Sequence, residues 1–285
     1  ELIGVRMKGP ISAAANASIT YDTVSVASPS SMTVDVADRV KTITSPEDGG
    51  IVSYTLYKVN SNGTVDLTAL NDDLEFDVSA VDGTVTVTDA VLLEGTLVKE
   101  VGTFTSPESI QSINLGESPY VERSAQVFLK GDAVTEGVYL EEDNLYFASG
   151  PTDKVFQVTT DPLFKASLLF GDNSTGQSPS IGDQYTVTYR VGGGTRGNIA
   201  EGSMNTPIEI TSIGGTSELI PQATLENTSI ATGGRGAESI AQARRYAPLV
   251  FRSQDRLVTL PDYKGFANSF ASNYGSTGKA TATVR

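Results

Sequence analysis

The chain has 285 residues, a formal net charge of −14 at pH 7, and no cysteine, histidine or tryptophan. These absences exclude disulfides, thiol chemistry, histidine-based acid–base catalysis and the usual zinc sites. With 39% hydrophobic residues the chain can bury one or two cores, and no stretch approaches the ~20 apolar residues of a membrane helix.

The charge is unevenly distributed along the chain. Residues 1–234 carry 12 Lys/Arg against 31 Asp/Glu, whereas residues 235–285 carry 8 against 3. Nucleic acid and anionic membranes repel so acidic a body, and neither is expected as a partner. Because the chain opens on Glu1 and Leu2 instead of Met or a basic signal region, we expect a fragment of a longer polypeptide.

Alternating β-branched and small polar residues predict strands from the N-terminus onward. Ser-Pro turns at Pro29 and Pro46 separate the first short strands, and a hairpin follows with its turn at residues 60–63. A second hairpin is predicted with Asp82-Gly83 as its turn. Turns every ~10–20 residues are typical of an all-β sandwich or barrel. The further strands predicted are 94–106, 111–115, 125–129, 138–140, 145–148 and 155–159.

Residues 170–202 contain the clearest strand of the chain. Tyr185 to Val191 alternate with a period of two, which is typical of a half-buried strand. Turns at Gly171-Asp172-Asn173 and at Pro179 with Gly182-Asp183 predict a long hairpin-like loop between this strand and the apolar run 166–170.

Three consecutive glycines, Gly192, Gly193 and Gly194, follow this strand. Such a loop can cradle a phosphate when a helix follows it. Here the following segment contains Pro207 and alternating isoleucines, and the Lys-Ser/Thr pair of a nucleotide loop is absent. A bulge or a sharp barrel corner is therefore favoured, and no cofactor is expected.

The acidic clusters do not predict an enzyme. The stretch 172–176 begins like a calcium loop but lacks the final bidentate acid, so a weak calcium site is the lesser alternative there. Acidic runs such as Asp72-Asp73 and Glu141-Glu142-Asp143 are typical of solvated turns. A different class stays open, namely an extracellular β-sandwich adhesin or carbohydrate-binding module.

The C-terminal fifth changes to helical patterns. A helix is predicted from residue 237, and a second one begins with Thr259 as N-cap and Asp262 at the capping-box position. In the second helix an apolar stripe formed by Tyr263, Phe266, Ala267 and Phe270 is predicted to be helix core.

Two stretches together resemble the baseplate J-like family, the wedge proteins of contractile phage tails. The first stretch contributes Phe170, Gly171, Asp172, Pro179, Gly182, Tyr189, Arg190, Gly192, Gly193, Gly194, Gly197 and Asn198. The second, over residues 233–267, contributes a Gly-rich turn, an Ala/Arg helix and Arg252, Arg256, Val258, Thr259, Asp262 and Tyr263.

This resemblance implies a mainly β chain with a C-terminal α part, in which an antiparallel β-barrel or sandwich precedes a small helical domain. The boundaries expected are a β-rich region at 1–126, a barrel portion at 127–214 and a linker with the start of the helical domain at 215–285. A further α/β domain of the family would be missing. The resemblance also implies a non-catalytic virion protein that assembles with wedge proteins and copies of itself into a six-fold ring.

The arginines Arg244, Arg245, Arg252 and Arg256 are candidate subunit-interface residues. Arg244 and Arg245 are about 100° apart on a helix, so both cannot face the apolar core. Either they pair with the acidic body of their own chain, or they dock onto an acidic surface of a neighbouring subunit.

Overall fold

A computed structural model describes most of the chain, and it is mainly β. Strands predominate, one sheet is a nearly closed barrel, and the helices near the C-terminal end are few and short, which confirms the predicted fold class. No helix among the described residues is long and apolar enough to cross a membrane. The described residues are 7–26, 30–66, 73–78, 81–106, 110–130, 138–213, 222–244, 248, 257–269, 271–272 and 275–276.

The chain forms two compact units that interleave in sequence. The first unit contains Glu1–Ile11, Leu97–Gly193 and Arg235–Arg285, and the second contains Ser12–Thr96 and Gly194–Gly234. This division differs from the three consecutive segments expected from the sequence. Local patterns predict strands, but they do not say which distant strand each one pairs with.

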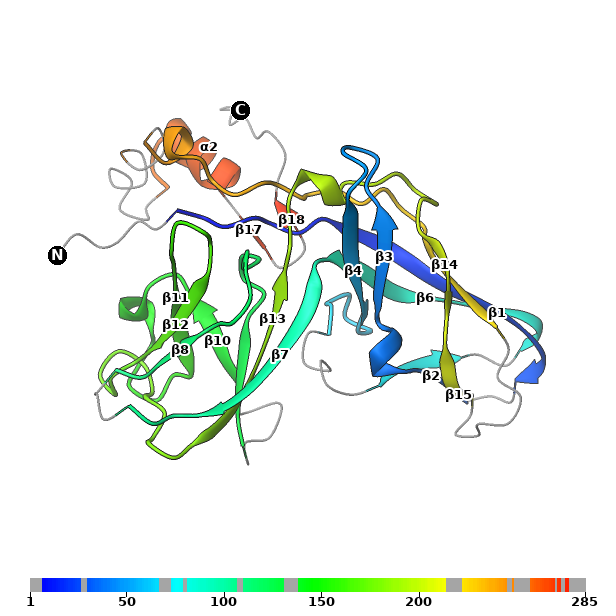
Figure 1. Ribbon diagram of the computed structural model, residues 1–285, viewed down its shortest axis with the longest axis horizontal. Helices are drawn as coiled ribbons and strands as arrows, with labels where there is room; N and C mark the ends of the chain where they lie inside the picture. The colour runs from blue at the N-terminus through cyan, green and yellow to red at the C-terminus, as the bar shows by residue number, and fades with distance from the viewer. Residues whose placement is uncertain are drawn as a thin grey trace. The chain divides into compact units, whose positions relative to one another are not determined.

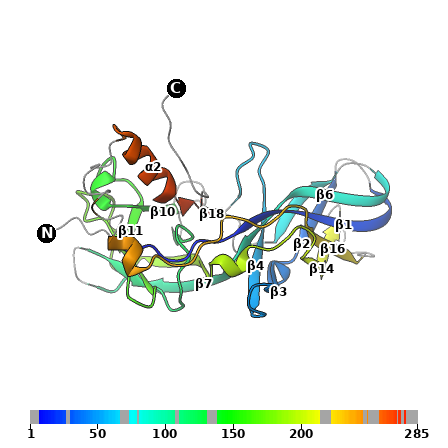
Figure 2. The same cartoon turned by 90° about the horizontal axis from the view of Figure 1, so that it is seen from above.

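The second unit consists of two antiparallel sheets. Their strands are β1 (Ala14–Val26), β2 (Ser30–Val34), β3 (Val40–Thr44), β4 (Ile51–Lys58), β5 (Leu74–Val78), β6 (Val81–Glu94), β14 (Asn205–Ile208), β15 (Ile210–Ile213) and β16 (Ala223–Asn227), with a 3-10 turn η1 at Val36–Asp38. The larger sheet has the order β14-β16-β1-β6-β4-β3, and the smaller has the order β15-β2-β5. The long strands β1 and β6 run side by side in both views (Figure 1, Figure 2).

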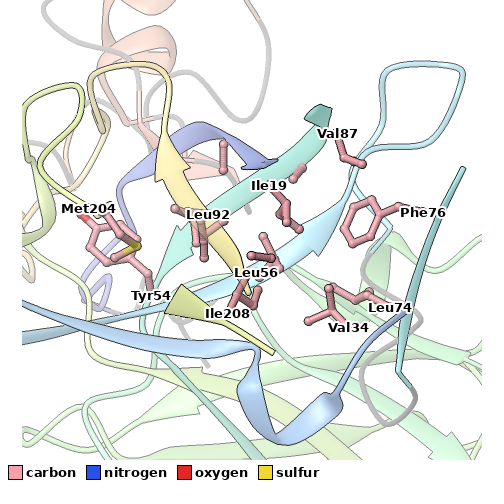
Figure 3. Close-up of a cluster of buried hydrophobic side chains, with 14 of the residues drawn as sticks. Ile19, Val34, Tyr54, Leu56, Leu74, Phe76, Val87, Leu92, Met204 and Ile208 are labelled. Atoms are coloured by element: carbon pink, nitrogen blue, oxygen red, sulfur yellow. The ribbon is translucent and has the colours of Figure 1, made fainter. Parts of the chain in front are cut away.

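Side chains from both sheets of the second unit meet in one apolar core. Figure 3 shows Ile19, Leu56 and Phe76, from three different strands, among the buried side chains of this cluster. The strand periodicity explains their position, because alternate residues of β5 are buried and exposed in turn. Burial of this kind contributes about 1.5–3 kcal/mol per large apolar side chain.

The first unit is organised around one seven-stranded sheet. Its strands are β7 (Thr96–Thr103), β8 (Ser112–Asn114), β9 (Gln126–Leu129), β10 (Val138–Glu142), β11 (Val155–Thr160), β12 (Ala166–Phe170) and β13 (Gln184–Val191), with a 3-10 turn η2 at Leu145–Phe147. A further 3-10 turn, η3 (Thr195–Gly197), belongs to the second unit. The order is β7-β13-β9-β10-β11-β12-β8. β10 and β11 are parallel, so the connection between them must cross one face of the sheet.

Aromatic rings form the centre of the first unit's core. Phe170 contacts Phe104 edge-on with ring centroids 5.3 Å apart, and Tyr139 edge-on at 5.2 Å. Phe156, on the neighbouring strand, lies 6.1 Å from the same ring. Edge-to-face packing of this kind adds about 0.5–1.5 kcal/mol per pair beyond burial. The position of Phe170 in the motif is therefore a core position.

Three local predictions are wrong. β12 and β13 do not form a hairpin, because β12 pairs with β11 and β8 while β13 pairs with β9. Asp82-Gly83 is not a turn but lies inside β6, where Gly83 has φ 100° next to a shift of register against β1. Residues 145–147 form the turn η2 instead of a strand, because the Asn144 side chain accepts from the Tyr146 backbone N–H and caps it.

The C-terminal helices begin close to where they were predicted. Residues 240–244 are helical, and α2 spans Leu260–Ser269; the short strands β17 (Ala271–Ser272) and β18 (Gly275–Ser276) follow. The apolar stripe of α2 is not core, since Tyr263 is 49% and Phe266 56% exposed. Phe270, Arg245, Arg252 and Arg256 lie outside the described residues.

Candidate functional site

The end of β13 buries Tyr189 in the first unit. Its hydroxyl donates to Glu100 Oε1 at 2.5 Å and accepts from the Glu117 backbone N–H at 2.9 Å. Glu100 Oε1 also accepts from the Gly116 backbone N–H at 2.9 Å. Burial, followed by the hydrogen bond to Glu100, raises the pKa of the Tyr189 hydroxyl. Tyr189 therefore fastens the loop after β8 to β7.

Arg190 is buried with only 2% of its surface exposed. Its backbone N–H donates to Ser124 Oγ at 3.0 Å, and its carbonyl accepts from the Val121 N–H at 3.0 Å. The Glu122 N–H in turn donates to the Pro10 carbonyl at 3.0 Å. The Tyr-Arg pair of the motif thus lies where β13 meets the segment 119–124, inside the unit and away from solvent.

The triple glycine has the positive φ values that the sequence predicts, and we call it the glycine corner. Gly192, Gly193 and Gly194 have φ values of 129°, 82° and 130°, a region that other residues adopt only with strain. A Cβ on Gly193 would lie 3.0 Å from Pro10 Cβ, so this position is also crowded. Gly194 has open space around it. The chain passes from the first unit to the second between Gly193 and Gly194.

In the second unit, Gly197 packs against a buried carboxylate. A Cβ on Gly197 would lie 2.1 Å from Cδ of Glu94, which is only 3% exposed. Glu94 Oε2 accepts from the Ala13 backbone N–H at 3.0 Å, and the Tyr54 hydroxyl donates to the Gly197 carbonyl. Burial, and secondarily the charge of Glu94, raises the pKa of Tyr54. Gly197 is therefore required by close approach.

Asn198 ties this corner to the strand segment that leaves the second unit. Its Nδ2 donates to the Gly234 carbonyl at 3.0 Å, and its Oδ1 accepts from the Gly234 N–H at 3.0 Å. A Cβ on Gly234 would meet the Gly194 carbonyl oxygen at 2.4 Å. This contact therefore requires glycine at position 234, which belongs to the Gly-rich turn that the sequence analysis identified.

The first part of the motif forms a self-contained turn. Asp172 Oδ1 accepts from the backbone N–H groups of Ser174 and Thr175, each at 2.9 Å. These hydrogen bonds, from Thr175 first, lower the pKa of the Asp172 carboxyl. A Cβ on Gly171 would lie 2.2 Å from the Gly176 carbonyl oxygen. The carboxylate is thus a turn-forming group, and no group of three or more acidic side chains suited to a metal occurs among the described residues.

The second turn of the motif fixes the start of β13. Pro179 is buried, and Gly182, with φ 93°, donates its N–H to the Phe104 carbonyl at 2.8 Å. The Phe104 N–H donates to Asp183 O at 3.0 Å, which ties the residue after β7 to the residue before β13. This turn therefore positions an edge of the sheet.

At the helical end, the structure places the cap residues as predicted. Asp262 Oδ2 accepts from the Thr259 backbone N–H at 2.8 Å, and α2 begins at the next residue, Leu260. Arg244 is exposed, and it forms no ion pair with any other described residue.

The motif residues therefore divide into separate structural roles instead of converging on one reacting centre. Sequence reasoning missed Glu94 and Tyr54, which contact Gly197, and Glu100, which binds the Tyr189 hydroxyl. Each lies far along the chain from the motif and carries no local signal. Comparison with protein-family models finds no match, and comparison with curated proteins finds none either.

Proposed function

We propose that this chain is a structural component of a phage tail baseplate wedge, without catalysis, that holds neighbours in a ring and transmits rearrangement when the tail contracts. The resemblance of residues 160–275 to the baseplate J-like family motivates the proposal. One observation carries it further: the polar motif residues Tyr189, Asp172 and Asn198 all hydrogen-bond backbone of their own unit. Residues bound in this way stiffen the backbone of their own unit, as a load-transmitting frame requires.

The experiment is immunogold labelling of particles from a phage-producing culture that encodes this chain, with an antibody raised against the purified protein. We expect label at the end of contractile tails farthest from the head. Label on the cell surface, or none on tails, would overturn the proposal. An antibody that recognises the unfolded chain only is excluded by testing it first on the native protein.

One observation favours the alternative of a carbohydrate-binding module. A hollow of about 490 Å³ in the first unit is lined by six polar or charged residues, where β8, β12 and β11 lie side by side. Its lining residues are Asn114, Thr159, Thr160, Asp161, Lys165 and Ser167. Hydroxyl and amide groups of this kind can hydrogen-bond a sugar.

That alternative is tested by calorimetric titration with a panel of mono- and oligosaccharides. Saturable binding that is lost in Thr160→Val and Asn114→Leu, together with cell-surface label, would favour the binding module. The wedge proposal expects no saccharide binding at this hollow.

A further inference from the structure

The connection between the parallel strands β10 and β11 displays aromatic side chains to solvent. It spans residues 143–154 and contains η2, in which Tyr146 is 80% and Phe147 55% exposed. Leu140, on β10, is 54% exposed, and it pairs with Val155 on β11. A connection that crosses a sheet ordinarily turns its apolar side chains toward that sheet, so this exposure is not explained by the fold of the unit.

Carboxylates lie close in sequence to these apolar side chains. Residues 138–156 contain Glu141, Glu142, Asp143 and Asp153, against Lys154 as the one basic residue. Asp143, whose side chain is 65% exposed, pairs with Arg123 at 2.5 Å. Glu142 and Asp153 are partly exposed. We call Leu140, Glu142, Asp143, Tyr146 and Phe147 the acidic aromatic surface.

The helical turn 240–244 presents the complementary chemistry. Ile240 is 62% exposed and Arg244 is exposed. They are four residues apart, and the turn is helical, as the Ala243 N–H donates to the Ser239 carbonyl at 2.9 Å. Side chains at this spacing lie on the same helix face. An apolar side chain and a guanidinium therefore stand together on this turn, which we call the basic turn.

We propose that the basic turn of one copy of this chain docks onto the acidic aromatic surface of a second copy. Ile240 then covers Tyr146 and Phe147, while the Arg244 guanidinium pairs with Glu142 or Asp143 and stacks on a ring. Both surfaces expose apolar side chains, and their charged residues are opposite in sign, Arg244 on one and Glu142 and Asp143 on the other. This complementarity favours a second copy as the occupant. The contact joins two different surfaces, so it is head-to-tail and closes into a ring when its rotation permits. This inference rests on the proposed assembly role.

The test is sedimentation of the full chain at low and high salt. We expect association that depends on protein concentration and weakens with salt. The double substitution Tyr146→Ser and Phe147→Ser should raise the dissociation constant roughly tenfold or more, because it removes the aromatic anchors of the interface. Leu163→Ser, at another site that is 76% exposed, is the matched control and should associate like the parent. Urea unfolding of every variant checks that each is folded.

Charge reversal identifies the two sides. One variant carries Glu142→Arg and Asp143→Arg, and a second carries Arg244→Glu. Each variant alone should self-associate more weakly than the parent. An equimolar mixture of the two should restore association, because the reversed charges then match. Lys130→Glu, an exposed reversal elsewhere in the first unit, should change little.

Two outcomes overturn the docking contact. If the parent associates but the reversed variants associate equally well, the assembly role survives and these two surfaces are not its contact. If the parent stays monomeric at low salt, copies of this chain do not dock in this way, and the proposed function is then decided by particle labelling alone.

Discussion

The side chain of Asn198 pairs with the backbone of Gly234 through two hydrogen bonds, each 3.0 Å long, as a neighbouring strand would. The amide supplies one donor and one acceptor, and the glycine supplies their complements. Both residues belong to the second unit. This contact holds the end of the corner against the segment that leads to the helical part.

We expect Asn198→Asp to destabilise the protein more than Asn198→Ala. Alanine loses two exposed hydrogen bonds, a cost of about 0.5–1.5 kcal/mol for each. Aspartate also replaces the Nδ2 donor with an oxygen that faces the Gly234 carbonyl. Urea unfolding measures the difference, with the exposed Asn205→Ala as the control. Equal stability of Asn198→Asp and the parent contradicts the pairing.

Substitutions of Gly197 and Gly194 should destabilise the protein for different physical reasons. Gly197→Ala should destabilise by about 2 kcal/mol or more, because its Cβ would overlap the buried Glu94 carboxylate. Gly194→Ala should cost about 1–3 kcal/mol through backbone strain alone, since φ is 130° and the space is open. Gly150→Ala meets neither a strained φ nor an atom within 4 Å and should be nearly neutral. Similar melting temperatures for all three variants would refute this account.

Stability should fall in alkaline solution. Burial raises the pKa of Tyr21, Tyr54, Tyr185 and Tyr189 in the folded protein. Above about pH 10 the unfolded chain releases these protons while the folded chain keeps them, so the free energy of unfolding decreases as pH rises. Because the chain has no tryptophan, ultraviolet titration reports tyrosine directly. In Tyr189→Phe the free energy of unfolding should decrease less steeply above about pH 10 than in the parent. An identical slope would show that Tyr189 does not contribute to the alkaline loss of stability.

Asp172 should have the opposite pH dependence. Hydrogen bonds from Thr175 and Ser174 lower its pKa in the folded state. The stabilisation is therefore present above the unfolded pKa of about 4 and is lost as pH falls through the folded value. An NMR titration should place the Asp172 midpoint below the pKa of about 4 that an unperturbed aspartate has. Asp172→Asn, which keeps an acceptor, should retain more of the turn than Asp172→Ala does.

Strands with a period of two could be predicted from the sequence because alternation depends on local burial. β13, β12 and β11 lie within a residue or two of their predicted positions. Asp82-Gly83 was misread because a glycine with positive φ suits a bulge as well as a turn, and only the register against β1 decides between them.

Pairing between distant residues could not be predicted in the same way. Ala17 on β1 pairs with Asn227 on β16, and the local sequence of neither segment indicates that they pair. The triple-glycine corner was predictable because consecutive glycines have few other uses after a strand. The burial of Glu94 against Gly197 was not predictable, because a carboxylate at the end of an apolar strand is ordinarily exposed to solvent.

The interleaving of the two units also determines when each can be completed during synthesis. β1 leaves the ribosome early, but its partner β16 ends at Asn227, so the larger sheet of the second unit stays open along this strand until most of the described chain has been made. Meanwhile the strands of the seven-stranded sheet in the first unit, the last of which ends at Val191, are already available to pair with one another. One edge of β1 therefore stays unpaired for most of the translation of the chain. An unpaired strand edge favours aggregation, and long-range β pairing that forms slowly prolongs this exposure. Neither unit can be produced by simple truncation, because each is assembled from separate segments of the chain.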